Sequence, residues 1–190
     1  MGLGSILFLG AILVFAAFGV MLYNGLVQLK HAVAKAWANI DVLLKQRHDE
    51  LPKLVEACKQ YKQFEQATLQ SVIQARSQVQ VARERQDVPA LGEAESALRA
   101  GIGQIFAVAE AYPELKANES FMQLQGRITA LENAIADRRE LYNEAVNINN
   151  VRVEQFPDAL VARLFRFDAK PLLEFAFAEK TDVDMKALFS

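Results

Sequence analysis

The stretch of sequence that decides the fold reads AWANIDVLL and occupies residues 36–44. It contains Trp37, the only tryptophan, and it follows an uncharged N-terminal run. Ala36, Ile40 and Leu43 are spaced by four and then three residues, so they lie on one face of a helix. The stretch begins the longest helical pattern in the chain. It is therefore predicted to join a membrane anchor to a helical bundle.

The uncharged run before this stretch is predicted to be the anchor. Residues 3–22 read LGSILFLGAILVFAAFGVML, and a helix of that length spans about 30 Å, the thickness of the hydrocarbon core of a bilayer. Tyr23 follows, where an amphipathic ring suits the headgroup region. A cleavable signal peptide would have basic residues before the run and an A-x-A pattern at its end, and this run has neither. Residues 3–23 are therefore predicted to be an uncleaved transmembrane helix in contact with the lipid bilayer.

The charges beside the predicted span bear on its orientation. Lys30 and Lys35 are the first charged side chains after it, and the positive-inside rule then favours a cytoplasmic soluble part. The prediction from the residues is a single-pass membrane protein.

A helical stripe of apolar residues continues from residue 24 to about residue 84, at a near-heptad spacing typical of coiled coils and bundles. Pro52 interrupts it, because proline lacks an N–H and its ring clashes with the carbonyl of His48. We therefore expect a kink or break near residues 48–52, with Asp49 as the N-cap of a restarted helix.

Two further long helices are marked by their caps. Asp87 and Pro89 begin a helix that ends at Pro113, and a loop over residues 113–117 then leads to Asn118. Asn118 is a good N-cap for a third long helix that ends before Pro157. Asp158 is expected to cap a short helix over residues 159–165.

The predicted fold class is all-α. An N-terminal transmembrane helix (residues 3–23) precedes an elongated antiparallel bundle of three long helices plus a short C-terminal helix (residues 24–166), because short connections between long helices imply antiparallel neighbours. Residues 167–190 form an aromatic-rich tail. In this tail Leu173, Phe175 and Phe177 alternate with other residues, which favours an extended segment.

Composition and motifs argue against several classes of function. A net charge of -2 and a pI near 5.8 exclude a strongly basic nucleic-acid-binding protein. The sequence contains no HExxH, GxxxxGK[ST] or GxSxG motif. We therefore predict no catalytic, cofactor-binding or metal-binding residue and no small-molecule substrate, and we do not expect an enzyme.

Four individual residues have a structural and a functional interpretation. His48 stands beside Asp49 with no second His or Cys one turn away, so we expect a capping or solvent-exposed role rather than a metal ligand. Cys58 falls on the apolar stripe and is expected to be a buried small hydrophobe. Gly101 and Gly103 are interpreted as small residues where helices approach closely, rather than as a phosphate loop.

Polar side chains in the predicted helices leave two alternatives open. Asparagines between packed helices fix their register, but they could also line a polar groove for a peptide or a partner helix. These asparagines are Asn39, Asn133, Asn143, Asn147, Asn149 and Asn150. Glu95 and Arg99, one turn apart, are interpreted as a supporting pair on a helix flank.

A basic segment near the C-terminus also has two interpretations. Arg163, Arg166 and Lys170 flank the apolar residues Leu160 and Leu164. The favoured interpretation is that this segment closes the end of the bundle with its charges solvated. The alternative is an amphipathic segment that lies on an anionic membrane surface.

These stretches together resemble the bacterial LemA family, over roughly residues 1–177. The resemblance rests on AWANIDVLLK (36–45), RHD (47–49), EAYPELKAN (110–118), YN (142–143) and FP (156–157). The resemblance implies one N-terminal span in the bacterial cytoplasmic (inner) membrane, followed by a helical bundle. The family offers no established catalytic residue to carry over. Some relatives carry a lipoprotein signal instead of the span, which pulls against a cytoplasmic bundle and leaves the side of the membrane open.

The expected function is that of a membrane-anchored, non-enzymatic helical scaffold or adaptor. It would bind another envelope protein, such as a membrane protease, or assemble with copies of itself. The alternative is a membrane-surface-binding or membrane-shaping protein that uses the basic segment over residues 163–170.

Overall fold

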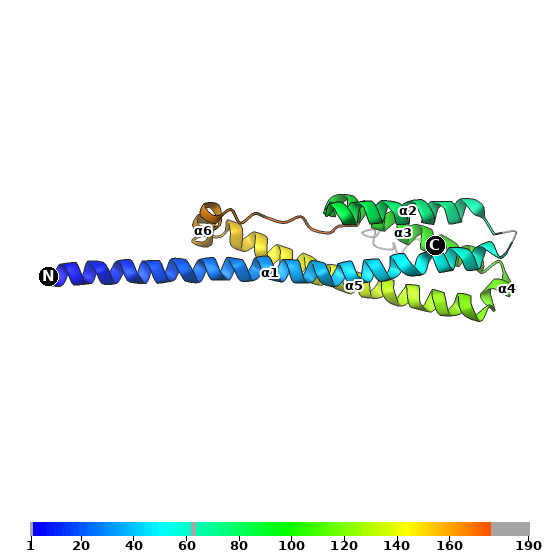
Figure 1. Ribbon diagram of the computed structural model, residues 1–190, viewed down its shortest axis with the longest axis horizontal. Coiled ribbons are helices and arrows are strands. Elements are labelled where there is room, and N and C mark those ends of the chain that lie inside the picture. Colours follow the sequence, from blue (N-terminus) through cyan, green and yellow to red (C-terminus); the bar gives the residue numbers. More distant parts are fainter. Residues whose placement is uncertain (1, 62–63, 176–190) are drawn as a thin grey trace, which may run out of the picture. The chain divides into compact units, whose positions relative to one another are not determined.

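The computed structural model describes residues 2–61 and 64–175, and all regular structure in this part of the chain is helical. The elements, labelled in Figure 1, are α1 (Leu3–Lys59), α2 (Gln66–Arg85), α3 (Val88–Ala109), α4 (Pro113–Lys116), α5 (Glu119–Glu154) and α6 (Asp158–Phe165). This confirms the all-α prediction. Phe177 and the other tail residues from 176 onward lie outside the described residues.

The N-terminal part of α1 is apolar and exposed. Its most apolar 18-residue window has a mean hydropathy of 2.1 and is only 6% buried. Large side chains such as Leu13 and Phe15 are 70% and 80% exposed. By length and composition α1 is a helix that could cross a membrane.

Pro52 lies inside α1 without ending it, so the predicted break and the Asp49 N-cap are wrong. A proline in a helix leaves the carbonyl four residues earlier without its usual N–H donor. Here that carbonyl belongs to His48, and it accepts a hydrogen bond from Arg76 Nε at 3.0 Å. The donor that Pro52 removes is thus replaced from α2, and Asp49 lies exposed on a continuous helix.

The apolar stripe that was expected to run to residue 84 is divided between α1 and α2. Residues 60–65 contain no Gly or Pro, so no local breaker marks this reversal. Phe64 in the connection is only 4% exposed, and its ring lies 5.7 Å from the ring of Tyr112. Tertiary packing, rather than a local breaker, decides where the chain reverses direction between α1 and α2. The first predicted long helix is therefore two helices.

The two local cap predictions for α3 and α5 are confirmed. Asp87 Oδ1 accepts a hydrogen bond from the Ala90 N–H at 3.2 Å, and Asn118 Oδ1 accepts one from the Phe121 N–H at 3.1 Å. Each cap satisfies an N–H that the helix itself leaves free.

Two other end predictions are wrong. Residues 113–116 form α4 rather than a loop, because proline is tolerated in the first turn of a helix. Asp158 is the first residue of α6 rather than its cap, and its Oδ1 accepts from Arg152 Nε at 3.1 Å and Nη2 at 2.7 Å.

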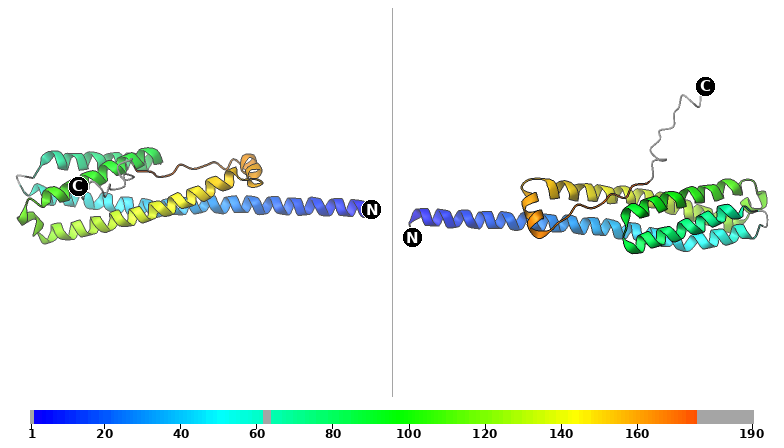
Figure 2. Two further views of the ribbon diagram at one scale, coloured as in Figure 1. Left: turned by 180° about the vertical axis from the view of Figure 1, so that it is seen from behind. Right: turned by 90° about the horizontal axis from the view of Figure 1, so that it is seen from above.

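Contacts group the described residues into two compact units. Unit 1 comprises those within Met1–Ile40 and Arg138–Leu172, and unit 2 those within Asp41–Asp137 and Leu173–Ser190. The helices α1 and α5 each contribute to both units. In unit 2, α2 and α3 pack side by side as an antiparallel pair (Figure 2). The separate segments 3–23, 24–166 and 167–190 stay predictions.

Small residues were expected at a close helix approach in what is now unit 2. A Cβ added to Gly101 would lie 2.8 Å from Val72 Cγ2, so α2 and α3 do approach closely there. Gly103 is different, since no atom of the described residues lies within 4 Å of its added Cβ, and its assignment to this contact is wrong. Cys58 is buried as predicted, and burial raises the pKa of its thiol to about 12.

Candidate functional site

Trp37 belongs to an aromatic contact in unit 1. The indole is half-buried and its ring lies 5.6 Å from that of Tyr142 on α5. The Tyr142 hydroxyl donates a hydrogen bond to the Pro171 carbonyl at 3.1 Å, and burial raises the pKa of this phenol. Trp37 therefore contacts Tyr142, and Tyr142 binds the segment after α6.

Asparagines on α5 bind the same segment by its backbone. Asn150 Nδ2 donates to the Lys170 carbonyl at 2.9 Å, and the Lys170 N–H donates to Asn150 Oδ1 at 2.8 Å. Asn149, only 3% exposed, donates to the Asp168 carbonyl at 3.4 Å. Asn149, Asn150 and Tyr142 therefore bind backbone atoms of residues 168–171 of this chain, and the alternative of a groove for a peptide or a partner helix stays a prediction.

These contacts use backbone atoms of the bound segment rather than its side chains. Recognition of this kind, as in strand addition, gives affinity without reading the bound sequence. The asparagines were expected to fix the register of packed helices. Asn149 and Asn150 instead hold the chain after α6, and Asn39, Asn133 and Asn147 are exposed.

The segment after α6 continues to Glu174, whose backbone approaches Gly92 on α3 in unit 2. A Cβ on Gly92 would lie 2.0 Å from the Glu174 carbonyl oxygen, so only glycine permits this approach. Leu173 beside it is 1% exposed. Sequence reasoning missed Gly92. The available signal was that a glycine inside a helix costs about 1 kcal/mol relative to alanine, so its presence indicates a packing role.

A buried cluster of charges lies in the core of unit 2. Arg47 on α1 is 1% exposed, and its Nη2 lies 2.5 Å from Glu95 Oε1 on α3. Its Nη1 lies 2.7 Å from Glu132 Oε1 on α5. Arg99 Nε approaches the second Glu132 oxygen at 3.8 Å.

The electrostatics of the cluster follow from burial. Burial opposes the charge on Arg47, but Glu95 and Glu132 together raise the pKa of its guanidinium. Burial likewise raises the pKa of the Glu95 carboxyl, and Arg47 acts against that rise. Charges at this depth are tolerated only in pairs, so the cluster makes α1, α3 and α5 depend on one another.

Sequence reasoning placed Glu95 on a helix flank with Arg99, which is wrong because Glu95 is 2% exposed. A sign of the cluster was available in the spacing. Arg47 stands between Leu44 and Leu51 at steps of three and four residues, and so lies on the apolar stripe of α1.

His48 lies inside α1 and contacts Arg76 rather than capping a helix. Its Nε2 lies 2.6 Å from Arg76 Nη2, and because arginine only donates, the imidazole accepts there and is neutral. Burial lowers the pKa of His48, and the charge of Arg76 adds to the effect. In residues 2–61 and 64–175 no group of three or more His, Cys, Asp or Glu side chains is placed to hold a metal ion.

The basic segment does not close the end of the bundle with its apolar residues inside. Leu160, Leu164 and Phe165 are 62%, 75% and 54% exposed, whereas Asp158 and Ala162 are buried. The charges of Arg163, Arg166 and Lys170 are solvated as expected, but the large aliphatic side chains of the segment face outward rather than into unit 1. Phe156, just before α6, is also 76% exposed.

Comparison with known proteins agrees with the resemblance of the quoted stretches. A curated relative, Protein LemA of Metamycoplasma hominis, is 26% identical over 165 residues, which cover 87% of this chain and 74% of that protein. The sequence model of the LemA family matches residues 36–186, well over half of the chain. The chain therefore belongs to the LemA family.

Proposed function

We propose that this protein is a membrane-anchored, non-enzymatic helical scaffold of the bacterial cytoplasmic membrane. In this proposal the N-terminal part of α1 crosses the bilayer once, and the rest of the chain presents a helical surface to another envelope protein or to further copies of itself. The observation that carries the proposal is the exposed apolar surface of α1 before residue 23. Water is a poor environment for such a surface, and the hydrocarbon core of a membrane is a good one.

The charged core of unit 2 supports a scaffold over an enzyme. Arg47 pairs with Glu95 and Glu132 inside the helices, Arg99 also approaches Glu132, and Arg47 and Glu95 are almost completely buried. General acid–base chemistry needs a titratable group within reach of a substrate. Here the strongly perturbed groups serve to hold helices together.

Exposed apolar residues on unit 2 are candidate contacts for a protein partner. Ile73 and Val81 on α2 are 44% and 43% exposed, and Met122 on α5 is 50% exposed. Photo-crosslinking amino acids at these three positions, in the full chain in living cells, test the proposal. We expect a crosslinked protein at one or more positions and its loss when residues 3–22 are deleted.

The control places the crosslinker at Glu84, an exposed position on a polar stretch of α2. A crosslink that survives with the purified protein in detergent identifies self-assembly, and one that needs cells identifies a second protein. Only monomer at every position, together with monomeric sedimentation in detergent, would contradict the scaffold.

A further inference from the structure

Helix α6 turns its leucines away from the protein. Asp158 and Ala162 are 4% and 1% exposed, whereas Leu160 and Leu164 are 62% and 75% exposed. Residues four apart share a helix face, and residues two apart lie on nearly opposite faces. The face against the protein therefore begins with an aspartate, and the outward face carries the large aliphatic side chains.

A polar contact holds α6 in this orientation. The buried Asp158 carboxylate accepts two hydrogen bonds from Arg152 near the end of α5, at 2.7 and 3.1 Å. A soluble protein normally does the reverse, with leucines inside and charges outside. An outward apolar face of this kind is stabilised where an apolar environment lies beside α6.

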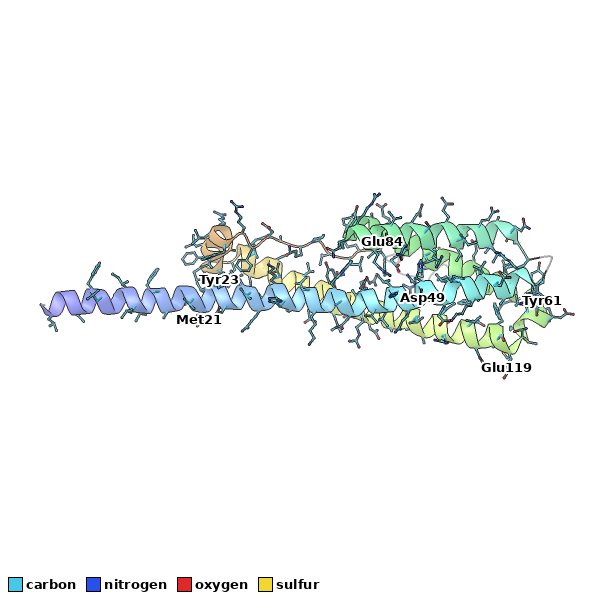
Figure 3. All side chains as sticks on the ribbon, in the orientation of Figure 1. Met21, Tyr23, Asp49, Tyr61, Glu84 and Glu119 are labelled. Carbon is cyan, nitrogen blue, oxygen red and sulfur yellow. The ribbon has the colours of Figure 1, made fainter. Side chains whose placement is uncertain are left out.

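The position of α6 identifies that environment. The ring of Tyr23, directly after the apolar run of α1, lies 4.8 Å from the ring of Phe165 and 5.7 Å from that of Phe167. Figure 1 shows α6 beside α1 at the point from which α1 continues alone toward the N-terminus. In Figure 3 the labelled Tyr23 lies on the side of α1 that faces α6. Helix α6 is thus at the level where α1 would leave the hydrocarbon core.

The polarity of α1 changes at this level. A hollow of about 560 Å³ beside α1 is lined by both apolar and polar residues. Ala17, Val20 and Met21 come from the apolar run, and Asn24, Gln28 and Arg152 come after it. This change within one hollow is the pattern expected where acyl chains meet headgroups.

We propose that α6 is an interfacial membrane helix. Together with the preceding Phe156, it lies in the headgroup region of the bilayer that α1 crosses and buries Leu160 and Leu164 at the boundary with the acyl chains. An amphipathic helix of this kind places its apolar face about 5–10 Å into the boundary region. The inference rests on the anchoring of α1 in the proposed function.

Charge indicates which lipids such a helix would meet. Arg163 and Arg166 at the end of α6, and Lys170 beyond it, are all exposed. Basic side chains next to an interfacial helix are attracted to anionic headgroups. The occupant of the outward face of α6 is therefore an anionic bilayer surface, continuous with the bilayer around α1.

Tryptophan fluorescence tests this inference, because the chain has a single tryptophan. Trp37→Phe provides a tryptophan-free background, into which Leu164→Trp or Leu160→Trp places a reporter on the outward face of α6. The full chain is reconstituted into vesicles of phosphatidylcholine and phosphatidylglycerol whose acyl chains are brominated near the headgroup. The matched control is Leu141→Trp, a 47% exposed apolar position of α5 about 20 Å along the helix from its end at Glu154.

We expect brominated lipids to quench both α6 reporters strongly and the control weakly. A vesicle-bound protein whose α6 reporters are quenched no more than the control would overturn the inference and leave the anchoring proposal standing. If the emission of the α6 reporters is blue-shifted but not quenched, protein rather than lipid covers this face, and the inference is again overturned. Protein that fails to float with the vesicles would overturn both proposals. Vesicles without phosphatidylglycerol should weaken the quenching, and equal quenching would remove the role of Arg163, Arg166 and Lys170.

Discussion

Arg76 Nε donates a hydrogen bond to the His48 carbonyl at 3.0 Å, and this carbonyl is the one that Pro52 deprives of its helical donor. A side chain of α2 thereby completes the backbone of α1. The second contact between the same residues, 2.6 Å from Arg76 Nη2 to His48 Nε2, orients the guanidinium. Helix α1 continues through a proline because a neighbouring helix supplies the missing hydrogen bond.

This relationship predicts an energetic coupling between Arg76 and Pro52. Arg76→Ala leaves the His48 carbonyl unpaired and should lower the free energy of unfolding by about 1–3 kcal/mol. In a Pro52→Ala background the restored N–H replaces Arg76, so the cost should fall by about 1 kcal/mol or more. Urea unfolding of the full chain in detergent measures the cycle. Arg83→Ala, which removes the pair with Asp41, is the control and should show no dependence on Pro52.

The same contact predicts a dependence of stability on pH. The pKa of His48 is lower in the folded protein than in the unfolded chain, because burial and Arg76 disfavour its protonated form. The unfolded state therefore binds more protons below about pH 6.5, and stability should fall as the pH drops through that value. His48→Gln keeps an acceptor for Arg76 and does not titrate. Thermal unfolding of both proteins between neutral and mildly acidic pH tests this, and identical pH profiles would contradict it.

The buried charges of unit 2 should act as one unit. Arg47→Met leaves Glu95 in the core without its cation and should cost roughly 3–5 kcal/mol of unfolding free energy. Adding Glu95→Leu removes the isolated carboxylate and should restore much of that loss. Urea unfolding of the single and double variants measures both effects. A loss below about 1 kcal/mol for Arg47→Met would show that water reaches the cluster.

Two glycines on α3 form a matched pair of tests. Gly92→Ala would place a Cβ 2.0 Å from the Glu174 carbonyl oxygen, so the segment must move, at a cost of about 1–3 kcal/mol. Gly103→Ala meets no atom of the described residues within 4 Å and should stabilise the helix by up to about 1 kcal/mol. Hydrogen exchange at residues 173–175 should accelerate in the first variant alone. Equal effects of the two substitutions would contradict the close approach.

Local signals predicted much of the fold from the sequence. The apolar run, the three-and-four spacing and the caps at Asp87 and Asn118 depend on residues a few positions apart. Pro52 was misinterpreted because its compensation comes from Arg76, 28 residues from His48. The reversal at residues 60–65 carries no Gly or Pro and depends on the burial of Phe64.

The candidate sites were predicted less completely than the fold. Their residues were visible, since Tyr142, Asn149 and Asn150 stood out in the sequence, but their common role was not. All three bind backbone atoms of residues 168–171. Contacts with backbone atoms do not restrict which side chains those residues carry, so the sequence of the bound segment gives no signal. The exposure of Leu160 and Leu164 likewise follows from the pairing of Asp158 with Arg152, which turns the opposite face of α6 toward the protein.

We propose that residues 3–22 anchor the protein in a membrane. Alkaline carbonate extraction of membranes from cells that make the full chain, followed by the intact mass of the recovered protein, tests this anchoring. We predict that the protein stays in the membrane pellet with a mass that includes residues 3–22. Release into the supernatant, or a recovered chain that lacks these residues, would contradict the claim.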